Sequence, residues 1–547
     1  MSASSKKKLR SEERTAKLTE RQLTEQKEAK KLTLMTRLFV VVLAVIVVAA
    51  AWVGITRGIT NSGIREKNTV AYTVGSHEIS NAEMNYFYVD SVNNFANTYG
   101  SYAAMFGLDL TKPLNEQYVD EEAGLTWADD FMSSAVDSAK SIYALYDAAI
   151  AAGHVLTEDE AFTVDTTMSN MQTYATLYNY SDIDTYLKAM YGAGASEEGF
   201  RAYFEMNALA TSYYNAYEAG LTYDDAAIRA ADAASPNTYN AYSYNYYSLS
   251  ASKFLTGGTE DEEGNVTYSD EERAAAIAAA EAAAKEVVGA EIKSVADLDA
   301  AIAALAVNAE VENASSTTIT DAAFDSVLGT VKDWVTDASR KVGDVTYVKN
   351  ASVTLDEEGN ETETINGYYV VMFTGMNDNS FALKNVRHIL AGFEGGTYDS
   401  NTGVTTYSDE EKAAAKEEAE ALLNGWKSGE ATEEAFAALA NEKSDDGDGT
   451  TGGLYENVYP GQMVTAFNDW CFDASRKAGD TDIVETEYGY HVMYFVGDSE
   501  ISYRDSMIEK DLRAADADAW YTALLETYTV VEGDTQYIPK DLVISAG

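Results

Sequence analysis

Two histidines in the last third of this 547-residue chain are the best candidates for chemistry, because each lies in a strand-like segment. His388 is part of VRHIL and His491 is part of GYHVM. Polar, glycine-rich and apolar motifs separate them in this order: Ser444-Asp445-Asp446, Gly452-Gly453, Gly461-Gln462-Met463 and Phe467. Histidines on apolar strands are more often buried core groups than catalysts, so the intervening motifs must decide between the two interpretations.

Composition excludes several other kinds of chemistry. Four scattered histidines without an HExxH motif do not make a metal site, and a single cysteine, Cys471, excludes intramolecular disulfides, CxxC redox chemistry and a lipid-bearing cysteine near the N-terminus. The net charge of -50 opposes binding to nucleic acid. The acidic runs DEEGN and DDGDG lack the ligand pattern of a calcium loop, so we interpret them as solvated turns. We therefore expect no cofactor, no metal and no nucleic acid partner.

An internal repeat supplies the elements that must position these residues. Three segments recur in the same order: TYSDEERAAAIAAAEAAAKEV and TYSDEEKAAAKEEAEALLNGW, DWVTDASRKVGD and DWCFDASRKAGD, NGYYVVMFTG and YGYHVMYFVG. Each copy begins with a strand-like run, continues through an Ala/Glu-rich helix that starts at Ser-Asp, and ends in a β-rich segment. The pattern predicts two α+β units. The first copy has 33 steps from Trp334 to Gly367 where the second has 19 from Trp470 to Gly489, and we expect the extra residues to lengthen a hairpin.

The second copy resembles the parvulin family of peptidyl-prolyl cis/trans isomerases. The motifs RHIL, Ser-Asp-Asp, Gly-Gly, GxM with Phe four residues later, and GYH carry this resemblance over residues 382–499. It implies a four-stranded antiparallel sheet with surrounding helices, in which the two strand histidines lie side by side beneath the substrate. One motif departs from the family, because its usual GGDLG reads Gly453-Leu454-Tyr455-Glu456 at the rim of the pocket.

The resemblance also assigns roles to residues. It implies a catalytic group made of the histidine pair, their hydrogen-bond partner and a residue facing the substrate carbonyl: His388, His491, Thr486 and Asp446. It implies a pocket for the proline ring lined by Met463 and Phe467.

The reaction that these residues would catalyse is a rotation. The X-Pro bond has a barrier of about 18–20 kcal/mol, and no covalent bond is broken when it turns. An apolar slot can grip the proline ring while a preorganised hydrogen-bonded pair favours the twisted amide. The resemblance places Asp446 at a position that carries either Cys or Asp in the family, and an Asp there argues against covalent catalysis.

The first copy is expected to lack this chemistry. Aligning YYSL with RHIL places Tyr247 at the position of His388, and aligning GYY with GYH places Tyr369 at that of His491. The two pocket positions are taken by Val327 and Val331. We predict an inactive unit that serves as a spacer or as a peptide-binding surface.

The N-terminal charge pattern predicts a membrane topology. Residues 1–37 hold eleven Lys and Arg against five Asp and Glu, and residues 38–56 are nineteen uncharged residues, enough for a membrane-spanning helix. The acidic remainder would then lie outside the cytoplasm. A cleaved signal peptide with an Ala49-x-Ala51 site is the alternative, although the long leader and long apolar run favour an anchor. The leader itself is either an amphipathic helix on anionic lipid or a solvated helix that sets orientation.

The segment from 68 to 237 reads as a hairpin, VAYTVGSHEIS, followed by long helices with aromatic residues at three- and four-residue spacing. We interpret most of these aromatics as the helix-packing core, the alternative being an adaptable surface for unfolded chains. Together with the parvulin unit and a final helix ending in YTVVEGD, this domain resembles the PrsA-like and SurA-like extracytoplasmic foldases, in which the C-terminal segment packs on the N-terminal domain.

These observations predict an α+β chain in seven parts. They are a basic cytoplasmic leader (1–37), a transmembrane helix (38–56), a linker (57–67), a helical chaperone-like domain (68–237), a degenerate parvulin-like domain (238–377), a parvulin domain (382–499) and a C-terminal helix and strand (500–547). The expected function is that of a membrane-anchored extracytoplasmic foldase, whose partners are newly exported or unfolded chains with X-Pro bonds. A holdase without catalysis is the main alternative, and a surface adhesin is a third possibility supported only by location.

Overall fold

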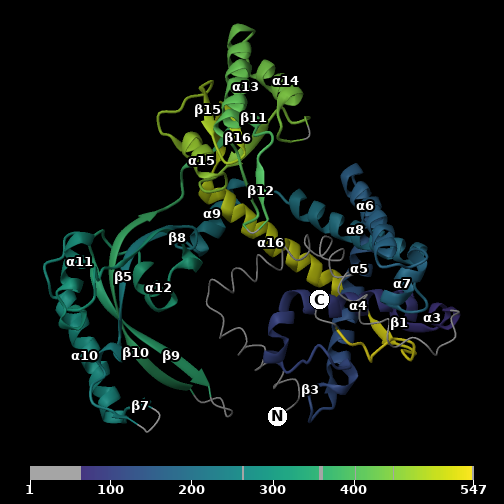
Figure 1. Cartoon of the computed structure of the whole chain (residues 1–547), viewed down its shortest axis with the longest axis horizontal. Helices are drawn as coiled ribbons and strands as arrows, with labels where there is room; N and C mark the ends of the chain where they lie inside the picture. Colours follow the sequence, from purple (N-terminus) through teal and green to yellow (C-terminus); the bar gives the residue numbers. More distant parts are fainter. Residues whose placement is uncertain (1–62, 261–263, 356–360, 401, 448, 545–547) are drawn as a thin grey trace. The chain divides into compact units, whose positions relative to one another are not determined.

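The computed structural model describes residues 63–544 except 261–263, 356–360, 401 and 448 (Figure 1). The predicted leader and membrane helix lie outside the described residues. None of the helices that the structure describes is long and apolar enough to cross a membrane. The described part of the chain divides into two compact units, one made of residues 63–222 with 511–544 and the other of Tyr223–Lys510.

The first unit is mainly helical. Its predicted hairpin is confirmed, with strands β1 (Val70–Val74) and β2 (His77–Ser80) joined through Gly75, whose φ of 56° suits glycine. A second short hairpin consists of β3 (Tyr118–Asp120) and β4 (Leu125–Thr126). The helices are α3 (Ile64–Asn68), α4 (Asn81–Tyr99), α5 (Trp127–Ala152), α6 (Glu158–Leu177), α7 (Ile183–Tyr191) and α8 (Glu197–Gly220).

Local sequence explains where these helices begin and what they bury. Helix α4 begins with a capping box in which Ser80 and Glu83 satisfy each other's backbone N–H groups, and α5 and α6 begin in the same way. The predicted aromatic core is confirmed for most of these residues: the largest fully buried side chains include Tyr86, Tyr88, Tyr186 and Phe200. Most of the aromatic residues of these helices are therefore used in packing.

The C-terminal segment completes the small sheet of the first unit. Strand β17 (Val530–Glu532) pairs antiparallel with β1, giving the order β17-β1-β2. The fully buried Asn81 donates from Nδ2 to the carbonyl of Thr69 over 2.8 Å and to that of Asp534 over 2.7 Å. Two backbone carbonyls that are far apart in the sequence thus accept the hydrogens of a buried side-chain amide.

The second unit contains the repeat as two four-stranded antiparallel sheets of the same strand order. The first sheet, in the order β8-β5-β10-β9, consists of β5 (Ala241–Ser250), β8 (Thr317–Ala323), β9 (Val345–Leu355) and β10 (Glu361–Asn377). The second, in the order β14-β11-β16-β15, consists of β11 (Ala382–Gly392), β14 (Leu454–Val458), β15 (Thr481–Glu485) and β16 (Gly489–Ser502). The helices are α9 (Asp225–Ala234), α10 (Asp270–Val288), α11 (Val295–Ala303), α12 (Gly329–Val335), α13 (Asp409–Ser428), α14 (Glu433–Lys443) and α15 (Thr465–Phe472). Two-stranded ribbons β6 (Thr259–Glu260) with β7 (Val266–Thr267) and β12 (Thr397–Asp399) with β13 (Val404–Thr406) precede α10 and α13, and α16 (Tyr503–Glu526) runs on into the first unit. The predicted four-stranded antiparallel sheet is thus confirmed.

The repeated motifs make the same contacts in both copies. Helices α10 and α13 begin with capping boxes at Ser269 and Ser408, as the Ser-Asp starts predict. Within the shared motif that begins Asp-Trp, Arg340 lies 4.9 Å from the centre of the Trp334 ring and Arg476 lies 4.1 Å from that of Trp470. The extra residues of the first copy lengthen the hairpin between β9 and β10, whose pairing extends to Leu355 and Glu361. That prediction is confirmed.

The strand register corrects one alignment made from the sequence. Gly489 pairs with Gly392 in the second sheet and Gly367 pairs with Ser250 in the first. Counting back from these pairs places Tyr246, and not Tyr247, at the position of His388. The alignment of YYSL with RHIL was therefore wrong by one residue, which matters because a one-residue slip moves a side chain to the opposite face of the sheet.

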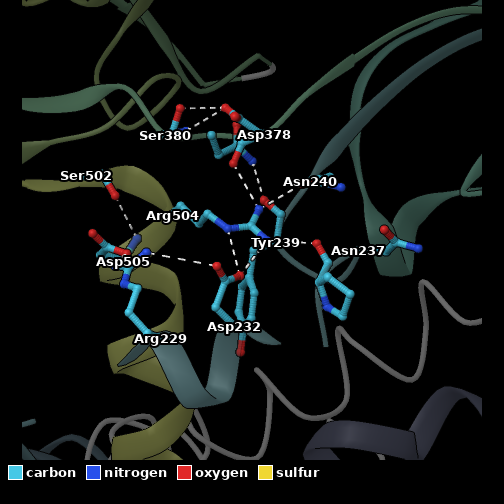
Figure 2. Close-up of polar contacts among 12 residues, drawn as sticks. Arg229, Asp232, Asn237, Tyr239, Asn240, Asp378, Ser380, Ser502, Arg504 and Asp505 are labelled. Atoms are coloured by element: carbon cyan, nitrogen blue, oxygen red, sulfur yellow. Dashed lines mark hydrogen bonds and ion pairs between the residues drawn. The ribbon is translucent and has the colours of Figure 1, made fainter. Parts of the chain in front are cut away.

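Arg504, at the start of α16, links several segments of the second unit (Figure 2). Its guanidinium donates to Asp232 Oδ1 of α9 over 2.6 Å, to Asn240 Oδ1 before β5 over 2.8 Å, and to the carbonyl of Asp378 between β10 and β11 over 3.0 Å. One planar fork of donors thus satisfies groups from three separate segments of the chain.

Candidate active site

The two predicted histidines lie on the two central strands of the second sheet. In the antiparallel register His388 pairs with Met493 and Leu390 with His491, so the histidines are diagonal neighbours on the same face. Their Nδ1 atoms lie 3.0 Å apart, and the two residues are only 2% and 6% exposed. The sheet therefore brings together two residues that are 103 positions apart in the sequence.

Thr486 and Asp446 extend this pair at either end. Asp446 Oδ2 lies 3.0 Å from His388 Nε2, and Thr486 Oγ1 lies 2.8 Å from His491 Nε2. An ionised carboxylate only accepts, so His388 donates from Nε2 and accepts at Nδ1. His491 then donates from Nδ1 and accepts the Thr486 hydroxyl proton at Nε2. The partners thus assign one tautomer to each neutral imidazole.

Both imidazoles are held in the neutral form. Burial lowers the pKa of His388, and it outweighs the nearby Asp446 carboxylate, which acts in the opposite direction. Burial also lowers the pKa of His491, to about 4, and the neighbouring His388 contributes to that shift. The hydrogen-bonded chain is therefore uncharged between Thr486 and the carboxylate near neutral pH.

Hydrogen bonds between the Ser-Asp-Asp motif and the backbone of β11 position Asp446 next to His388. Ser444 Oγ accepts from the backbone N–H of Leu390 over 3.1 Å and from that of Asp446 over 3.2 Å. Asp445 donates its backbone N–H to the carbonyl of Leu390 and accepts the N–H of Gly392 at its carboxylate. Ser444 and Asp445 thus bind the backbone of β11, and the carboxylate of Asp446 contacts His388.

The Gly-Gly pair allows β14 to approach β11 closely. Gly453 has a φ of 63°, and a Cβ there would lie 2.1 Å from the carbonyl oxygen of His388. A Cβ on Gly452 would lie 2.7 Å from Arg387 Nη1. A side chain at Gly453 would therefore displace the strand that carries the first histidine, whereas one at Gly452 would displace the end of the Arg387 side chain.

Phe467 lies beside the histidines, and Met463 packs against the apolar cluster to which Phe467 belongs. The Phe467 ring, on α15, stands edge-on to both imidazoles with centroid distances of 5.4 Å. It belongs to a cluster with Val386, Trp470 and Met493, against which the partly buried Met463 packs. An apolar wall thus adjoins the polar pair.

Comparison with known proteins agrees with this geometry. Residues 368–497 match the family of the PPIC-type PPIASE domain. The chain contains a parvulin domain. The foldase protein PrsA 1 of Listeria innocua serovar 6a is 33% identical to this chain over 105 residues, which are 19% of the chain and 33% of that protein. The chain therefore matches about a third of the length of this curated relative.

Two of the solved structures with partial likeness are PrsA proteins. PrsA from Bacillus anthracis is 20% identical over 27% of this chain and 59% of its own, with a TM-score of 0.17. PrsA from Bacillus subtilis is 23% identical over 26% of this chain and 48% of its own, with a TM-score of 0.16. Because both TM-scores are low, the assignment rests on the family match and on the local geometry.

The parvulin domain has an open cavity of about 590 Å³ next to Thr486. The start of α15 and the turn between β15 and β16 line it, through Val464, Thr465, Ala466, Glu485, Thr486 and Glu487. Two carboxylates thus flank the threonine that binds His491. No group of three or more His, Cys, Asp or Glu side chains in the described part of the chain is placed to hold a metal ion.

Sequence reasoning missed one residue of the site, Tyr455 of the parvulin domain. Its hydroxyl donates to Asp446 Oδ2 over 2.9 Å, and its ring lies 5.0 Å from that of His388. The only signal in the sequence was the departure from GGDLG at this position, which by itself does not indicate a hydrogen bond.

The first sheet carries tyrosines where the parvulin domain carries histidines. By register these are Tyr246 and Tyr369, whose rings meet edge to face at 5.7 Å. Val327 and Val331, the predicted counterparts of the pocket residues, are buried in the adjoining cluster. With tyrosines at both positions, this face has no hydrogen-bonded histidine pair like that of the second sheet.

Proposed function

We propose that this chain is a foldase that catalyses cis/trans isomerisation of X-Pro bonds in exported proteins. The observation that carries the proposal is the neutral pair of His388 and His491, hydrogen-bonded at 3.0 Å beside Phe467. The PrsA relative, which is itself named a foldase, supports the same role.

The site suits a rotation better than bond cleavage. Cys471 is fully buried, and burial raises the pKa of its thiol to about 12, so no thiolate is at hand as a nucleophile. The two imidazoles are themselves fixed and uncharged dipoles, and such groups can favour a twisted amide without reorganising. Each tenfold acceleration needs about 1.4 kcal/mol of preferential binding to that twisted state.

We assign the roles as follows. His388 and His491 form the floor of the site, with their tautomers set by Asp446 and Thr486. Phe467 and Met463 hold the proline ring. Asp446, whose side chain is 39% exposed, faces the approaching peptide while it holds His388.

We propose that the chain is anchored by residues 38–56 and acts outside the cytoplasm. The support is the basic leader, the uncharged run and the acidic remainder of the chain. Newly exported chains with X-Pro bonds are then the natural substrates.

A holding function is favoured by a separate observation on the first unit. Helix α6 leaves Phe162 71% exposed and Leu177 65% exposed, and Met105 is 81% exposed. Apolar side chains left in solvent can bind unfolded segments. We propose this holding role alongside catalysis, and a holdase without catalysis remains the second candidate.

A proline-isomerisation assay on the whole chain tests the first proposal. We expect wild type to accelerate the isomerisation of several X-Pro peptides. We also expect His388→Ala, His491→Ala and Met463→Ala each to lower kcat/KM by at least about tenfold. His154→Ala is the matched control, because His154 bonds Ser212 in the first unit. A wild-type chain without measurable catalysis would overturn the proposal.

An aggregation assay tests the holding role. The double change Phe162→Ser and Leu177→Ser removes exposed apolar surface and should weaken protection of an unfolded client, while kcat/KM on peptides stays unchanged. Unchanged protection would show that α6 does not hold clients.

A further inference from the structure

Tyr455 lies on β14 next to the histidine strand. It pairs with Val386 of β11, two residues before His388. Its ring is tilted by 39° to the His388 ring at 5.0 Å, and it stands edge-on to Phe467 at 6.4 Å. The phenol therefore borders both the polar pair and the apolar wall.

The Tyr455 hydroxyl and His388 share one acceptor atom. Asp446 Oδ2 receives the hydroxyl over 2.9 Å and His388 Nε2 over 3.0 Å. A carboxylate oxygen has two lone pairs, so it can accept both donors at once. Each bond then restricts the rotation of the carboxylate in a loop that is otherwise partly exposed to solvent.

We propose that Tyr455 is a positioning residue of the isomerase site, whose hydroxyl holds the Asp446 carboxylate against His388 and shares its charge, so that His388 stays neutral. This inference rests on the proposed function. It gives a role to one of the residues at which the sequence departs from the GGDLG motif.

Of the charged groups near His388, Asp446 is the one that contacts its imidazole. Asp445 is turned to the backbone N–H of Gly392, and Arg387 is paired with Glu433. On the other strand His491 is neutral and meets His388 through Nδ1. The carboxylate of Asp446 raises the pKa of His388 against the effect of burial, and a donor on that carboxylate weakens its influence.

Protonation of His388 would reverse the direction of the hydrogen bonds that join His388, His491 and Thr486. A charged imidazole donates from both nitrogens, so His491 would have to accept at Nδ1 and carry its hydrogen on Nε2. The Thr486 hydroxyl would then have to accept instead of donate. A donor that keeps His388 neutral therefore preserves the direction of every bond in the site.

Packing alone is the simpler explanation of Tyr455, since the ring is part of the cluster around Val386 and Phe467. Tyr455→Phe separates the two explanations, because it keeps the ring and removes only the hydroxyl. Tyr528→Phe is the matched control. In the first unit the Tyr528 hydroxyl donates to Asp147 over 2.7 Å, and Asp147 also binds His77 over 2.9 Å, which repeats the same three residue types away from the proposed site.

The experiment measures kcat/KM of the whole chain on an X-Pro peptide between pH 5 and 8, together with an NMR titration of His388. For Tyr455→Phe we expect the pKa of His388 to rise toward its ordinary value and the acid limb of kcat/KM to move up with it. At pH 6 the loss should be up to about fourfold, because an imidazole with an ordinary pKa near 6.5 is still about one quarter neutral there, while at pH 8 kcat/KM should remain near wild type. Tyr528→Phe should leave both curves in place.

Asp446→Asn should move the pKa of His388 in the opposite direction, because it removes the charge itself. It also keeps the inference testable if Tyr455→Phe folds poorly. A uniform loss at every pH, or curves identical to wild type, would overturn the role of the hydroxyl. If the wild-type chain has no isomerase activity, the proposed function fails, whereas the NMR titration still tests the contact between Tyr455, Asp446 and His388.

Discussion

His388 and His491 share one proton between two Nδ1 atoms that lie 3.0 Å apart. Only one of these atoms can carry the hydrogen when both rings are neutral, so the state of each histidine depends on the other. Thr486 at one end and Asp446 at the other decide which ring donates. The pair is therefore both a buried polar contact that the fold must satisfy and the part of the proposed site most sensitive to acid.

Acid should open the second sheet and spare the first. The unfolded chain has histidines of ordinary pKa near 6.5, whereas burial lowers the pKa of His491 to about 4 in the folded chain. Between these values the unfolded state binds more protons, so the free energy of unfolding falls as pH falls from about 6.5 to about 4, by on the order of 3 kcal/mol. Hydrogen exchange of β16 peptides, corrected for intrinsic rates, checks this. Peptides of β10 are the internal control, because tyrosines occupy the matching positions there, and equal acid sensitivity of both strands would contradict the prediction.

Gly453→Ala should disturb the site through the backbone of His388. A Cβ there would lie 2.1 Å from the carbonyl oxygen of His388, so β11 must shift, and we expect kcat/KM to fall by at least about tenfold. Gly461→Ala is the control. Its φ of 81° imposes a similar backbone strain, but nothing lies within 4 Å of the added Cβ. If both variants lose activity equally, strain in the left-handed region and not the close approach is the cause.

Asp90→Asn should stabilise the first unit at neutral pH. Burial raises the pKa of Asp90 to about 6, although Tyr203 and Tyr191 donate to its carboxylate and act in the opposite direction. Because the folded state binds the proton more tightly, the free energy of unfolding falls as pH rises from about 4 to about 6. The variant should therefore resist urea better than wild type at pH 7, by roughly 1–3 kcal/mol, and little better at pH 4. Hydrogen exchange of α4 peptides in urea measures the difference, and a variant weaker at pH 7 would refute the argument.

Peptides with a cationic residue beside the proline should be preferred. Glu485 and Glu487 line the cavity next to Thr486, and nearby carboxylates attract a positive side chain at moderate ionic strength. We expect kcat/KM for a Lys-Pro peptide to exceed that for a Glu-Pro peptide by about threefold to tenfold, and salt to reduce the ratio. Glu487→Gln should reduce this ratio as well. Glu430→Gln, an exposed change in the turn between α13 and α14, should not. A ratio that is independent of both salt and Glu487 would show that the cavity does not contact this side chain.

The regular elements of the second unit were predictable because their signals are local. Capping residues such as Ser269 and Ser408 mark helix starts, and the repeated motifs predicted two sheets that the structure confirms. The register between strands depends on residues that are distant in the sequence. The alignment that chose Tyr247 over Tyr246 was wrong for that reason. A short run of tyrosines offers several equivalent alignments, and only the pairing of Gly367 with Ser250 selects one.

By itself the sequence determined the types and the order of the residues that could make an isomerase site: His388, Asp446, Met463, Phe467, Thr486 and His491. It also determined the charge pattern from which a membrane topology is predicted. Only the tertiary structure decided the distances between these groups, the direction of the hydrogen bonds that join them, and the inclusion of Tyr455. The reason is physical: a side chain acquires its partners and its pKa from residues that are distant in the chain, and the folded sheet alone brings those residues together.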